Sequence, residues 1–499
     1  MKNVLGRDVP YRPFEGAREH CDLRKFIPSS PKKKTVFKSL EEVLDSLELH
    51  DGMTISFHHH LRNGDFVLNM VMEELHNRGI KNITLAASSL FPCHEPLVKM
   101  LKDGTVTKIH TGYISGAVAK AVSDGLCKEV VTIGTHGGRP RAILEGDIEI
   151  DVAFVAASAV DSNGNITGSE GKNSCGVLGY AYPDCVMAKK VVVITDTKKE
   201  KLIDIEISGE YVDYVVEVEE IGNPEGIVSG TTQITKDPVG LKIARDTVEL
   251  IKHSGLFKDG FSFQSGAGGI SLTCASELRE LMRKDNVHGS FASGGITGYI
   301  TDMLDEGLFD ELWDVQCFDL KAAKSLTKNP KHKKMTSYDY ADPNNPEAIA
   351  SKLDFVILGC SEIDLDYNVN VTTGSDGVIL GGSGGHADTS CGAKLSIIVS
   401  KLVNARVSSV VDKVGTVSTP GETVDVIVTD RGIAVNPKNS ELIEKLRETK
   451  LDIVTIEELF ERALELTGVP KKKESRGRIV AVSEYRDGTL LDVIRLAEK

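Results

Sequence analysis

Residues 151–165, DVAFVAASAVDSNGN, and residues 354–368, DFVILGCSEIDLDYN, are two versions of one pattern. Each begins with an aspartate, continues as an apolar run typical of a buried strand, and ends in a polar turn. The polar landmarks recur at the same offsets, as Ser158, Asp161 and Asn165 in the first stretch and as Ser361, Asp364 and Asn368 in the second. This match indicates a duplicated structural unit.

The repeat continues upstream of both stretches. Asp51-Gly52 and Asp259-Gly260 each open an apolar strand, which is followed by a helical stretch and by a further strand after Asn82 or Asn286. Strands that alternate with helices favour a mostly parallel sheet. The sequence therefore predicts an α/β fold with two similar open α/β domains. Ligands of such sheets bind at the carboxyl ends of strands, so we expect the active site in the cleft between the domains.

The chain has 499 residues, which is too long for one ordinary hydrophobic core. Residues 223–226, Asn-Pro-Glu-Gly, interrupt the pattern of strands and helices and indicate a junction. We therefore predict an N-terminal extension over residues 1–34, a first α/β domain over residues 35–228, and a second over residues 229–499.

Composition narrows the class of partner. The net charge of −14 argues against nucleic acid, because phosphate binding needs a basic face. No apolar run approaches the ~18 residues of a spanning helix, and the charged N-terminus does not resemble a signal peptide. The sequence thus predicts a cytoplasmic protein that makes no use of a membrane. The cysteines form no C-x-x-C pair, and no metal site is predicted.

Residues 321–334 form a basic segment in an otherwise acidic chain, with six lysines, a histidine and no acid. A solvated surface loop is the simplest interpretation. The alternative is a surface that steers an anionic partner.

Two glycine clusters could hold an anion or an oxyanion. Residues 264–271 follow a strand and precede a helix, and their candidates for binding a cofactor are Gly266, Gly268 and Gly269. Residues 381–388 contain Gly381 and Gly382, also assigned to the cofactor, and the catalytic candidates Gly384 and Gly385. Glycine lets backbone N–H groups approach a ligand closely. Neither cluster matches a dinucleotide or P-loop fingerprint, and a tight turn would also explain each glycine pair.

Cationic side chains end two predicted strands of the first domain. Side chains alternate along a strand, so His58 and His60 are expected to share a face, with Arg62 close by. A second group, His136, Arg139 and Arg141, follows another strand. Arginine forks match carboxylates bidentately, so these six residues predict a pocket for a polycarboxylate. Metal binding by the histidines lacks a carboxylate or a cysteine at ligand spacing.

Several longer motifs resemble those of the acyl-CoA:carboxylate CoA-transferases. The C-terminal GGSGGHADTSCGAKL (381–395) and VDVIVTDRGIAV (424–435) are similar to their glycine-rich turn and following strand, and SEIDLDYNVN (361–370) and FQSGAGGI (263–270) match two further segments. GMTISFHHHLRNGD (52–65) and residues 158–184 resemble, more narrowly, the citrate lyase alpha-subunit family. The resemblance covers nearly the whole chain and implies two α/β domains of one type.

One departure from the CoA-transferase pattern concerns the nucleophile. Relatives that form an enzyme-bound intermediate place a catalytic glutamate in a strand where this sequence has Ser290. Asp430 also replaces a glutamate of the later motif. Glu362 is the nearest alternative carboxylate, and we expect it either to act at the site or to orient the glycine turn.

The resemblance implies that citrate displaces acetate from an acyl-carrier thioester by direct carboxylate attack, through a mixed anhydride. It implies a CoA-derived thiol arm on an acyl carrier (gamma) subunit, or acetyl-CoA, with no cofactor bound covalently to this chain. A lyase (beta) subunit would complete an oligomeric complex. The alternatives are the alpha subunit of citramalate lyase, another carboxylate CoA-transferase, a phosphosugar isomerase, or a ligand-sensing domain; the fold alone does not separate them.

Overall fold

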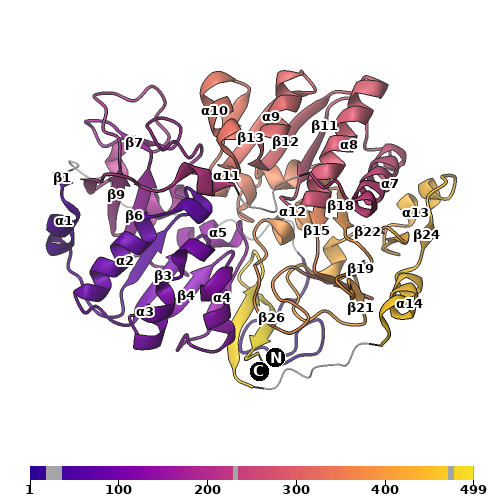
Figure 1. Ribbon diagram of the computed structural model, residues 1–499, viewed down its shortest axis with the longest axis horizontal. Helices are drawn as coiled ribbons and strands as arrows, with labels where there is room; N and C mark the ends of the chain where they lie inside the picture. Colours follow the sequence, from indigo (N-terminus) through magenta and orange to yellow (C-terminus); the bar gives the residue numbers. More distant parts are fainter. Residues whose placement is uncertain (18–35, 229–233, 470–476, 498–499) are drawn as a thin grey trace.

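The structure is a computed structural model that describes residues 1–17, 36–228, 234–469 and 477–497. Two α/β halves lie side by side, the first in indigo and magenta and the second from magenta through orange to yellow (Figure 1). Each half contains one large sheet. The predicted α/β class is confirmed. No helix in the described ranges is long and apolar enough to cross a membrane.

The first sheet has ten strands, and its neighbours pair in parallel except for the last two. In spatial order they are β1 (Val36–Lys38), β10 (Tyr214–Glu217), β9 (Lys190–Thr195), β6 (Val152–Ala157), β2 (Thr54–Phe57), β3 (Ile83–Ala87), β4 (Val106–Thr111), β5 (Val131–Ile133), β25 (Ile479–Glu484) and β26 (Leu490–Arg495).

The second sheet has nine strands, of which only β22 and β23 pair antiparallel. In spatial order they are β14 (His332–Lys334), β13 (Phe309–Cys317), β12 (Gly289–Ile296), β11 (Phe261–Ser265), β15 (Phe355–Gly359), β18 (Leu395–Val399), β22 (Val426–Thr429), β23 (Gly432–Val435) and β24 (Ile453–Val454).

Seven strands follow the same spatial order in both sheets. The first sheet runs β5-β4-β3-β2-β6-β9-β10, and the second runs β14-β13-β12-β11-β15-β18-β22. The strands of each series also occur in the same sequence order. A duplicated unit predicts this correspondence.

The polar landmarks of the repeat make the same hydrogen bonds in both halves. Asp161 accepts the backbone N–H of Asn165 at 3.0 Å, and Asp364 accepts that of Asn368 at 2.9 Å. Each asparagine in turn accepts the backbone N–H of a glycine in a later loop, at 2.8 and 3.0 Å. These carboxylates are buried. A buried aspartate needs several donors, which explains why the pattern keeps Asp and Asn together.

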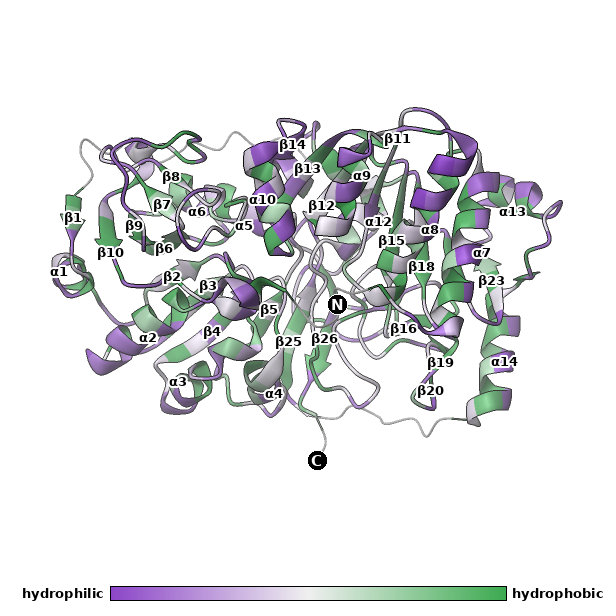
Figure 2. Cartoon of the chain, turned by 45° about the horizontal axis from the view of Figure 1, so that its top comes forward, coloured by the Kyte–Doolittle hydropathy of each residue, from purple (hydrophilic) through white to green (hydrophobic). Residues whose placement is uncertain are grey.

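Helices connect the strands. They are α1 (Leu40–Ser46), α2 (Val67–Asn77), α3 (Leu97–Asp103), α4 (Gly116–Ser123), α5 (Gly138–Leu144), α6 (Tyr182–Met187), α7 (Pro238–Ser254), α8 (Gly269–Asp285), α9 (Gly298–Asp305), α10 (Leu320–Lys328), α11 (Ser337–Ala341), α12 (His386–Gly392), α13 (Ser440–Leu446) and α14 (Ile456–Thr467). Apolar strand residues form the core against these helices, and polar residues gather on the outer faces of the helices (Figure 2).

Helix α7 shows how local sequence sets these boundaries. Asp237 caps it by accepting the N–H of Gly240, and Pro238 fits the first turn, where no backbone donor is needed. Gly255 ends it in the left-handed conformation, with φ +87°.

Short strands and 3₁₀ turns fill the loops. The strands are β7 (Ala159–Val160), β8 (Ile166–Thr167), β16 (Glu362–Asp364), β17 (Val369–Asn370), β19 (Val403–Asn404), β20 (Val407–Ser408) and β21 (Val410–Val411). The 3₁₀ turns are Arg62–Gly64, Pro92–His94, Gly209–Tyr211, Pro224–Ile227, Ile349–Lys352 and Gly421–Thr423.

The C-terminal hairpin departs from the predicted boundaries. Strand β25 pairs in parallel with β5, so residues 479–495 extend the first sheet although 229–499 was predicted as the second domain. The boundary at 228/229 touches residues 229–233, which lie outside the described part. The N-terminal segment, predicted as an extension, packs on the same hairpin: the Phe14 N–H donates to Leu490 O at 2.9 Å, and its ring contacts Tyr485.

Arg486 ties the hairpin to the second domain. It is 1% exposed, donates to Ala341 O at 2.9 Å, and lies 3.5 Å from the Asp388 carboxylate in α12. Burial raises the pKa of Asp388 to about 6, and the Arg486 charge counteracts part of that rise. The pair therefore joins two sheets inside the protein.

We expect Arg486→Met to lower the free energy of unfolding by roughly 3 kcal/mol, because it leaves a buried carboxylate without its cation. Urea unfolding measures the loss. The double variant Arg486→Met/Asp388→Asn should recover part of it, and the exposed Arg431→Met should change little. A single variant as stable as the wild type would contradict the role of the pair.

Candidate functional site

The carboxyl ends of the two sheets meet at a seam, where loops of both halves bond to each other. Gln316, near the end of β13, donates through Nε2 to the backbone oxygen of His59, which follows β2, at 3.0 Å. The backbone N–H of His136, after β5, donates to Gly384 O at 2.8 Å. The structure therefore brings the predicted cationic loops and the second glycine cluster together.

The glycine turn 381–385 is pressed against the first domain. A Cβ at Gly382 would collide with the backbone of Gly112, and one at Gly385 would collide with the Tyr340 hydroxyl. Gly381 is similarly crowded. Gly384 has φ +53°, and its N–H donates to Gly112 O at 3.1 Å.

These contacts distinguish the two predicted catalytic glycines of the turn, Gly384 and Gly385. The N–H of Gly384 already holds the seam together. The N–H of Gly385 makes no hydrogen bond within the described residues and remains available to a ligand.

Residues His58 to His60 follow the end of β2 and face two ways. The rings of His58 and His60 lie 5.6 Å apart on one side, and their Nε2 atoms bond to Ala156 O at 2.8 Å and Ile221 O at 3.1 Å. Both are therefore held inside the first domain by its backbone. His59 points the other way, toward the seam.

His59, His136 and Tyr180 form an aromatic group at the seam. The His59 ring lies 6.0 Å from His136 and 4.7 Å from Tyr180. The Tyr180 hydroxyl bonds to Nδ1 of His136 at 2.6 Å, and the buried Nε2 of His136 has no partner within the described residues. Sequence reasoning missed His59 and Tyr180, although the triplet and GYAYPD contain them.

The histidines at the seam are neutral. Burial lowers the pKa of His136 to about 3, with Arg139 and Arg62 adding to the effect, and burial also lowers the pKa of His59 well below its usual value. When Tyr180 donates to Nδ1, the proton of His136 resides on Nε2. Such an imidazole presents a hydrogen-bond donor to an anion without carrying a charge.

Arg62 is the predicted arginine that lacks a carboxylate partner in the described part of the chain. Its guanidinium lies over Phe318 at 4.5 Å and over Phe91 at 5.5 Å, and it donates to Ile227 O at 3.1 Å. Burial lowers its pKa to about 10, so it stays charged at neutral pH. Its φ of +54° is unusual for a non-glycine residue.

Arg139 and Arg141 differ from the prediction because carboxylates already occupy them. Arg139 forms a bidentate bond with Asp184 at 2.8 and 2.9 Å. Arg141 donates to Glu145 at 2.8 Å and to Asp147 at 2.7 Å. The Arg139 pair joins α5 to α6 and the Arg141 pairs hold the end of α5, so their arrangement supports a structural role.

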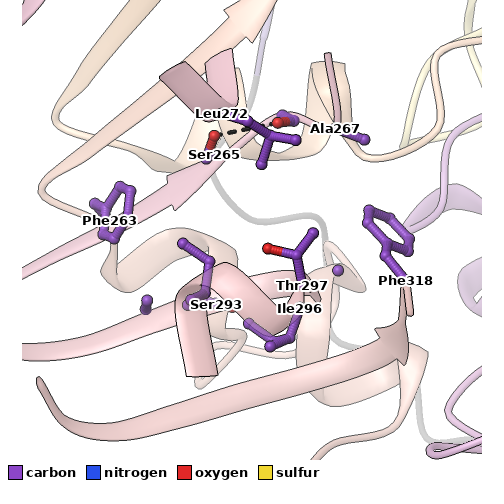
Figure 3. A pocket seen from close by; sticks show the side chains of 12 residues that line it. Phe263, Ser265, Ala267, Leu272, Ser293, Ile296, Thr297 and Phe318 are labelled. Atoms are coloured by element: carbon purple, nitrogen blue, oxygen red, sulfur yellow. Dashed lines mark hydrogen bonds between the residues drawn. The ribbon is translucent and has the colours of Figure 1, made fainter. Parts of the chain in front are cut away.

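A pocket opens beside the seam at the carboxyl ends of β11 and β12 (Figure 3). Its cavity volume is small, about 10 Å³, and the wider hollow of about 290 Å³ around it includes open solvent. Its walls are mainly apolar, and the buried hydroxyls of Ser293 and Thr297 have no partner within the described residues. Phe318 forms one wall and carries Arg62 on its ring, so the pocket and the seam adjoin.

A second contact path joins the pocket to the glycine turn. Gln264, beside the pocket residues Phe263 and Ser265, donates to the Tyr340 hydroxyl at 2.9 Å. That hydroxyl packs against Gly385. Both side chains are buried, so this path runs through the interior of the protein.

The first glycine cluster contributes to this pocket in part. Gly266 lines the pocket, and Gly268 is the cap of α8. Gly269 begins the helix. A side chain at Gly268 would meet open space, so no close approach explains that glycine.

Glu362 and Ser290 lie in positions that do not suit a nucleophile. Glu362 lies in the three-stranded sheet formed by β17, β16 and β21. Its Oε2 accepts hydrogen bonds from the Gly415 N–H at 2.8 Å and from Asn370 at 2.9 Å. Ser290, which stands where relatives have a catalytic glutamate, is the second residue of β12 and donates to Phe261 O at 3.2 Å. It therefore sits at the opposite end of the strand from the pocket. Within the described residues no group of three His, Cys, Asp or Glu could hold a metal ion.

We expect the side chains of His59 and His136 to remain neutral down to pH 5. The folded protein would then bind fewer protons than the unfolded chain below about pH 6.5, so these histidines lower its stability on acidification. Histidine ¹⁵N spectra between pH 8 and 5 measure this, with His136→Gln assigning the signal. An imidazolium signal for His136 at pH 6 would contradict the buried, neutral site.

Comparison with known proteins identifies one family over nearly the whole chain. The family described as "Citrate lyase, alpha subunit (CitF)" matches residues 33–497. A citrate lyase alpha chain from Haemophilus influenzae is 47% identical over 469 residues, or 94% of each chain. A citrate lyase alpha chain from Klebsiella pneumoniae is 44% identical over 472 residues, which are 94% of this chain and 92% of that relative.

Solved structures agree. A crystal structure described as the alpha subunit of citrate lyase from Streptococcus mutans, in complex with citrate, superposes with a TM-score of 0.95 at 44% identity over 100% of both chains. A 4-hydroxybutyrate CoA-transferase from Porphyromonas gingivalis, 19% identical over 86% of this chain and 97% of its own with a TM-score of 0.55, shares the fold. The resemblance in the motifs is thus confirmed across nearly the whole sequence, and this chain belongs to the citrate lyase alpha-subunit family.

Proposed function

We propose that this chain is the transferase of a citrate lyase, which exchanges acetate for citrate on an acyl-carrier thioester. Membership of the alpha-subunit family over residues 33–497 carries the proposal. The geometry supports it, because the seam offers an uncompensated cation and a neutral donor beside a mainly apolar pocket.

The exchange has two balanced steps. A carboxylate oxygen of citrate attacks the acetyl thioester carbonyl; a C–O bond forms, the C–S bond breaks, and the thiolate leaves. The thiolate then attacks the citryl carbonyl of the mixed anhydride, and acetate leaves as the C–O bond breaks. A carboxylate is a weak nucleophile, so positioning and oxyanion stabilisation must supply the rate.

The seam residues supply these two contributions. Arg62 has the charge and the planar fork to hold a citrate carboxylate. Nε2 of His136 and the N–H of Gly385 can donate to the oxygen that becomes negative as each carbonyl is attacked. A neutral donor in a dry site stabilises developing charge without first being neutralised by the substrate carboxylates.

We place the end of a CoA-derived arm in the adjoining pocket, which must widen to admit it, because its cavity volume is about 10 Å³. Its apolar walls fit the alkyl portions of the arm, and Ser293 and Thr297 can pair with its amides. In this proposal the arm belongs to an acyl carrier subunit or to acetyl-CoA, and the chain holds no cofactor covalently. The carrier and a lyase subunit would be its partners in a complex.

Direct attack by citrate is favoured over an acyl-enzyme. Glu362 is buried and accepts through one oxygen, Oε2, from Gly415 and Asn370, and Ser290 lies at the far end of β12. Asp388 holds the seam by accepting from Thr135 at 2.9 Å and from the Gly137 N–H at 3.0 Å. None of these groups combines exposure to substrate with an unpaired carboxylate.

The acetylated carrier should release acetate only when citrate is present. Acetate release and free thiol are measured with citrate, with citramalate and with buffer alone. A faster reaction with citramalate would favour the citramalate lyase subunit. A burst of thiol or acetate without citrate would contradict direct attack, and inactivity with every carboxylate would favour an isomerase or a sensing domain.

The role of His136 predicts a difference between two variants. His136→Phe removes the donor and should lower kcat about 10²- to 10³-fold, the usual effect of losing one oxyanion donor. His136→Gln keeps an N–H group and should retain much more activity. KM for citrate should change little in either variant, and equal kcat values would exclude His136 as the donor.

A further inference from the structure

We propose that Asp65 and His94 are positioning residues, which hold the guanidinium of Arg62 in the place where it meets citrate. This inference deepens the proposed function and rests on its assignment of Arg62 to a citrate carboxylate. Both side chains lie inside the first domain, where Asp65 is 2% exposed and His94 is fully buried.

The backbone of Arg62 has a conformation that needs support from its surroundings. Its φ of +54° lies in the left-handed region, which non-glycine residues seldom occupy. Such a conformation persists only where neighbouring contacts hold it. The 3₁₀ turn Arg62–Gly64 has only three residues, so contacts from outside the turn must help to fix the direction of the guanidinium.

The carboxylate of Asp65 follows directly on this turn and divides its oxygens between two elements. Oδ1 accepts the N–H of Val67, in the first turn of α2, at 2.7 Å and lies 3.7 Å from Nδ1 of His60. Oδ2 accepts from Nε2 of His94 at 3.1 Å. The backbone N–H of Asp65 donates to Arg62 O at 3.3 Å. Asp65 therefore ties the Arg62 turn to a helix and to the loop after β3.

His94 extends this link to an aromatic ring that Arg62 contacts. Nδ1 of His94 accepts the backbone N–H of Phe91 at 3.1 Å, so the ring proton resides on Nε2 and points to Asp65. The ring of Phe91 lies 5.5 Å from the Arg62 guanidinium, within reach of a cation–π contact. His94 thus satisfies both partners in a single tautomer.

Further hydrogen bonds join the same two loops. The N–H of Cys93 donates to Oδ1 of Asn63 at 3.0 Å, and the side chain of Asn69 donates to Cys93 O at 2.8 Å. The turns Arg62–Gly64 and Pro92–His94 therefore form one unit beyond the ends of the neighbouring strands β2 and β3 (Figure 2). A change in the Asp65–His94 bond is transmitted to Arg62 through both its backbone and the Phe91 ring.

A helix cap alone does not explain the pair. Aspartate and asparagine cap helices about equally well, so the bond to Val67 would allow either residue. The bond to His94 would not, because an amide that keeps its oxygen on Val67 turns an N–H group toward the Nε2 proton of His94. If the imidazole moves that proton to Nδ1, the conflict passes to the N–H of Phe91. Asp65→Asn therefore keeps the cap and removes one bond of His94.

The test measures citrate binding to the full chain by isothermal titration calorimetry. Asp65→Asn should raise the Kd for citrate about tenfold, the lower end of the effect of losing a charge-assisted hydrogen bond. KM for the acetylated carrier should stay within about twofold of the wild type. His94→Leu should also raise the citrate Kd, and His94→Gln, which keeps an N–H group near the position of Nε2, should raise it less. A wild-type Kd in Asp65→Asn would overturn the proposal.

A double-variant cycle tests whether the pair acts through Arg62. Arg62→Ala should raise the citrate Kd, and Asp65→Asn added to Arg62→Ala should change it by less than about twofold. Additive effects would overturn the positioning role, because Asp65 would then act independently of Arg62. An equal rise in KM for the acetylated carrier would overturn it in favour of a general loosening of the domain.

Asp151 offers a matched control at the other end of β2. Its carboxylate accepts the N–H of Thr54, the first residue of the strand, at 2.8 Å. Asp151→Asn should leave the citrate Kd unchanged, although it alters a carboxylate that holds the same strand. A rise equal to that of Asp65→Asn would overturn the specific role of Asp65.

Failure of the proposed function gives a different result. A citrate Kd in Arg62→Ala equal to that of the wild type would remove Arg62 from the citrate site and overturn the inference together with that assignment. A wild-type chain that binds citrate but transfers no acetyl group would refute the transferase. The citrate Kd values of the variants would then still decide the role of Asp65 and His94.

Discussion

The carboxylate of Asp388 is the contact on which the arrangement of the site depends. It extends from the second domain into the first, where it accepts from Thr135 and Gly137, and it lies beside Arg486 of the returning hairpin. Three distant parts of the chain thus converge on one buried group. Because His136 stands inside the turn that Asp388 organises, the orientation of a catalytic candidate is coupled to the packing of the two halves.

The electrostatics of the seam follow from what each charge already contacts. Carboxylates occupy Arg139 and Arg141, and burial keeps the histidines neutral, which leaves Arg62 as the predicted arginine without a carboxylate partner in the described residues. A site crowded with several positive charges would bind a tricarboxylate tightly before the reaction as well as in its transition state. One cation and neutral donors concentrate stabilisation on the charge that develops during the reaction.

The sequence predicted the fold because the repeat is local. Apolar runs and the Asp161 and Asp364 turns depend on nearby residues, and their hydrogen bonds recur as expected. The return of residues 479–495 to the first sheet could not be predicted, since no short pattern encodes a pairing with β5.

Within the site, the structure brings the glycine turn 381–385 against the turn after β5, through the bond from the His136 N–H to Gly384 O. The roles of single residues were less predictable. Alternation placed His58 and His60 on one face, but it does not reveal which face looks toward the second domain. The partner of Arg139, Asp184, lies in another helix and is visible only in three dimensions.

The hairpin also has a consequence for how the chain folds during synthesis. Until residues 479–495 have been made, β5 is an edge of the first sheet, with one side of its backbone unpaired. The second domain is translated in the meantime and can form its own sheet. The first sheet therefore gains its neighbour for β5 only after almost the entire chain has been made. A contact of such long range slows completion of the fold. Until it forms, the open edge of β5 is a place where a nascent chain can aggregate or require a chaperone.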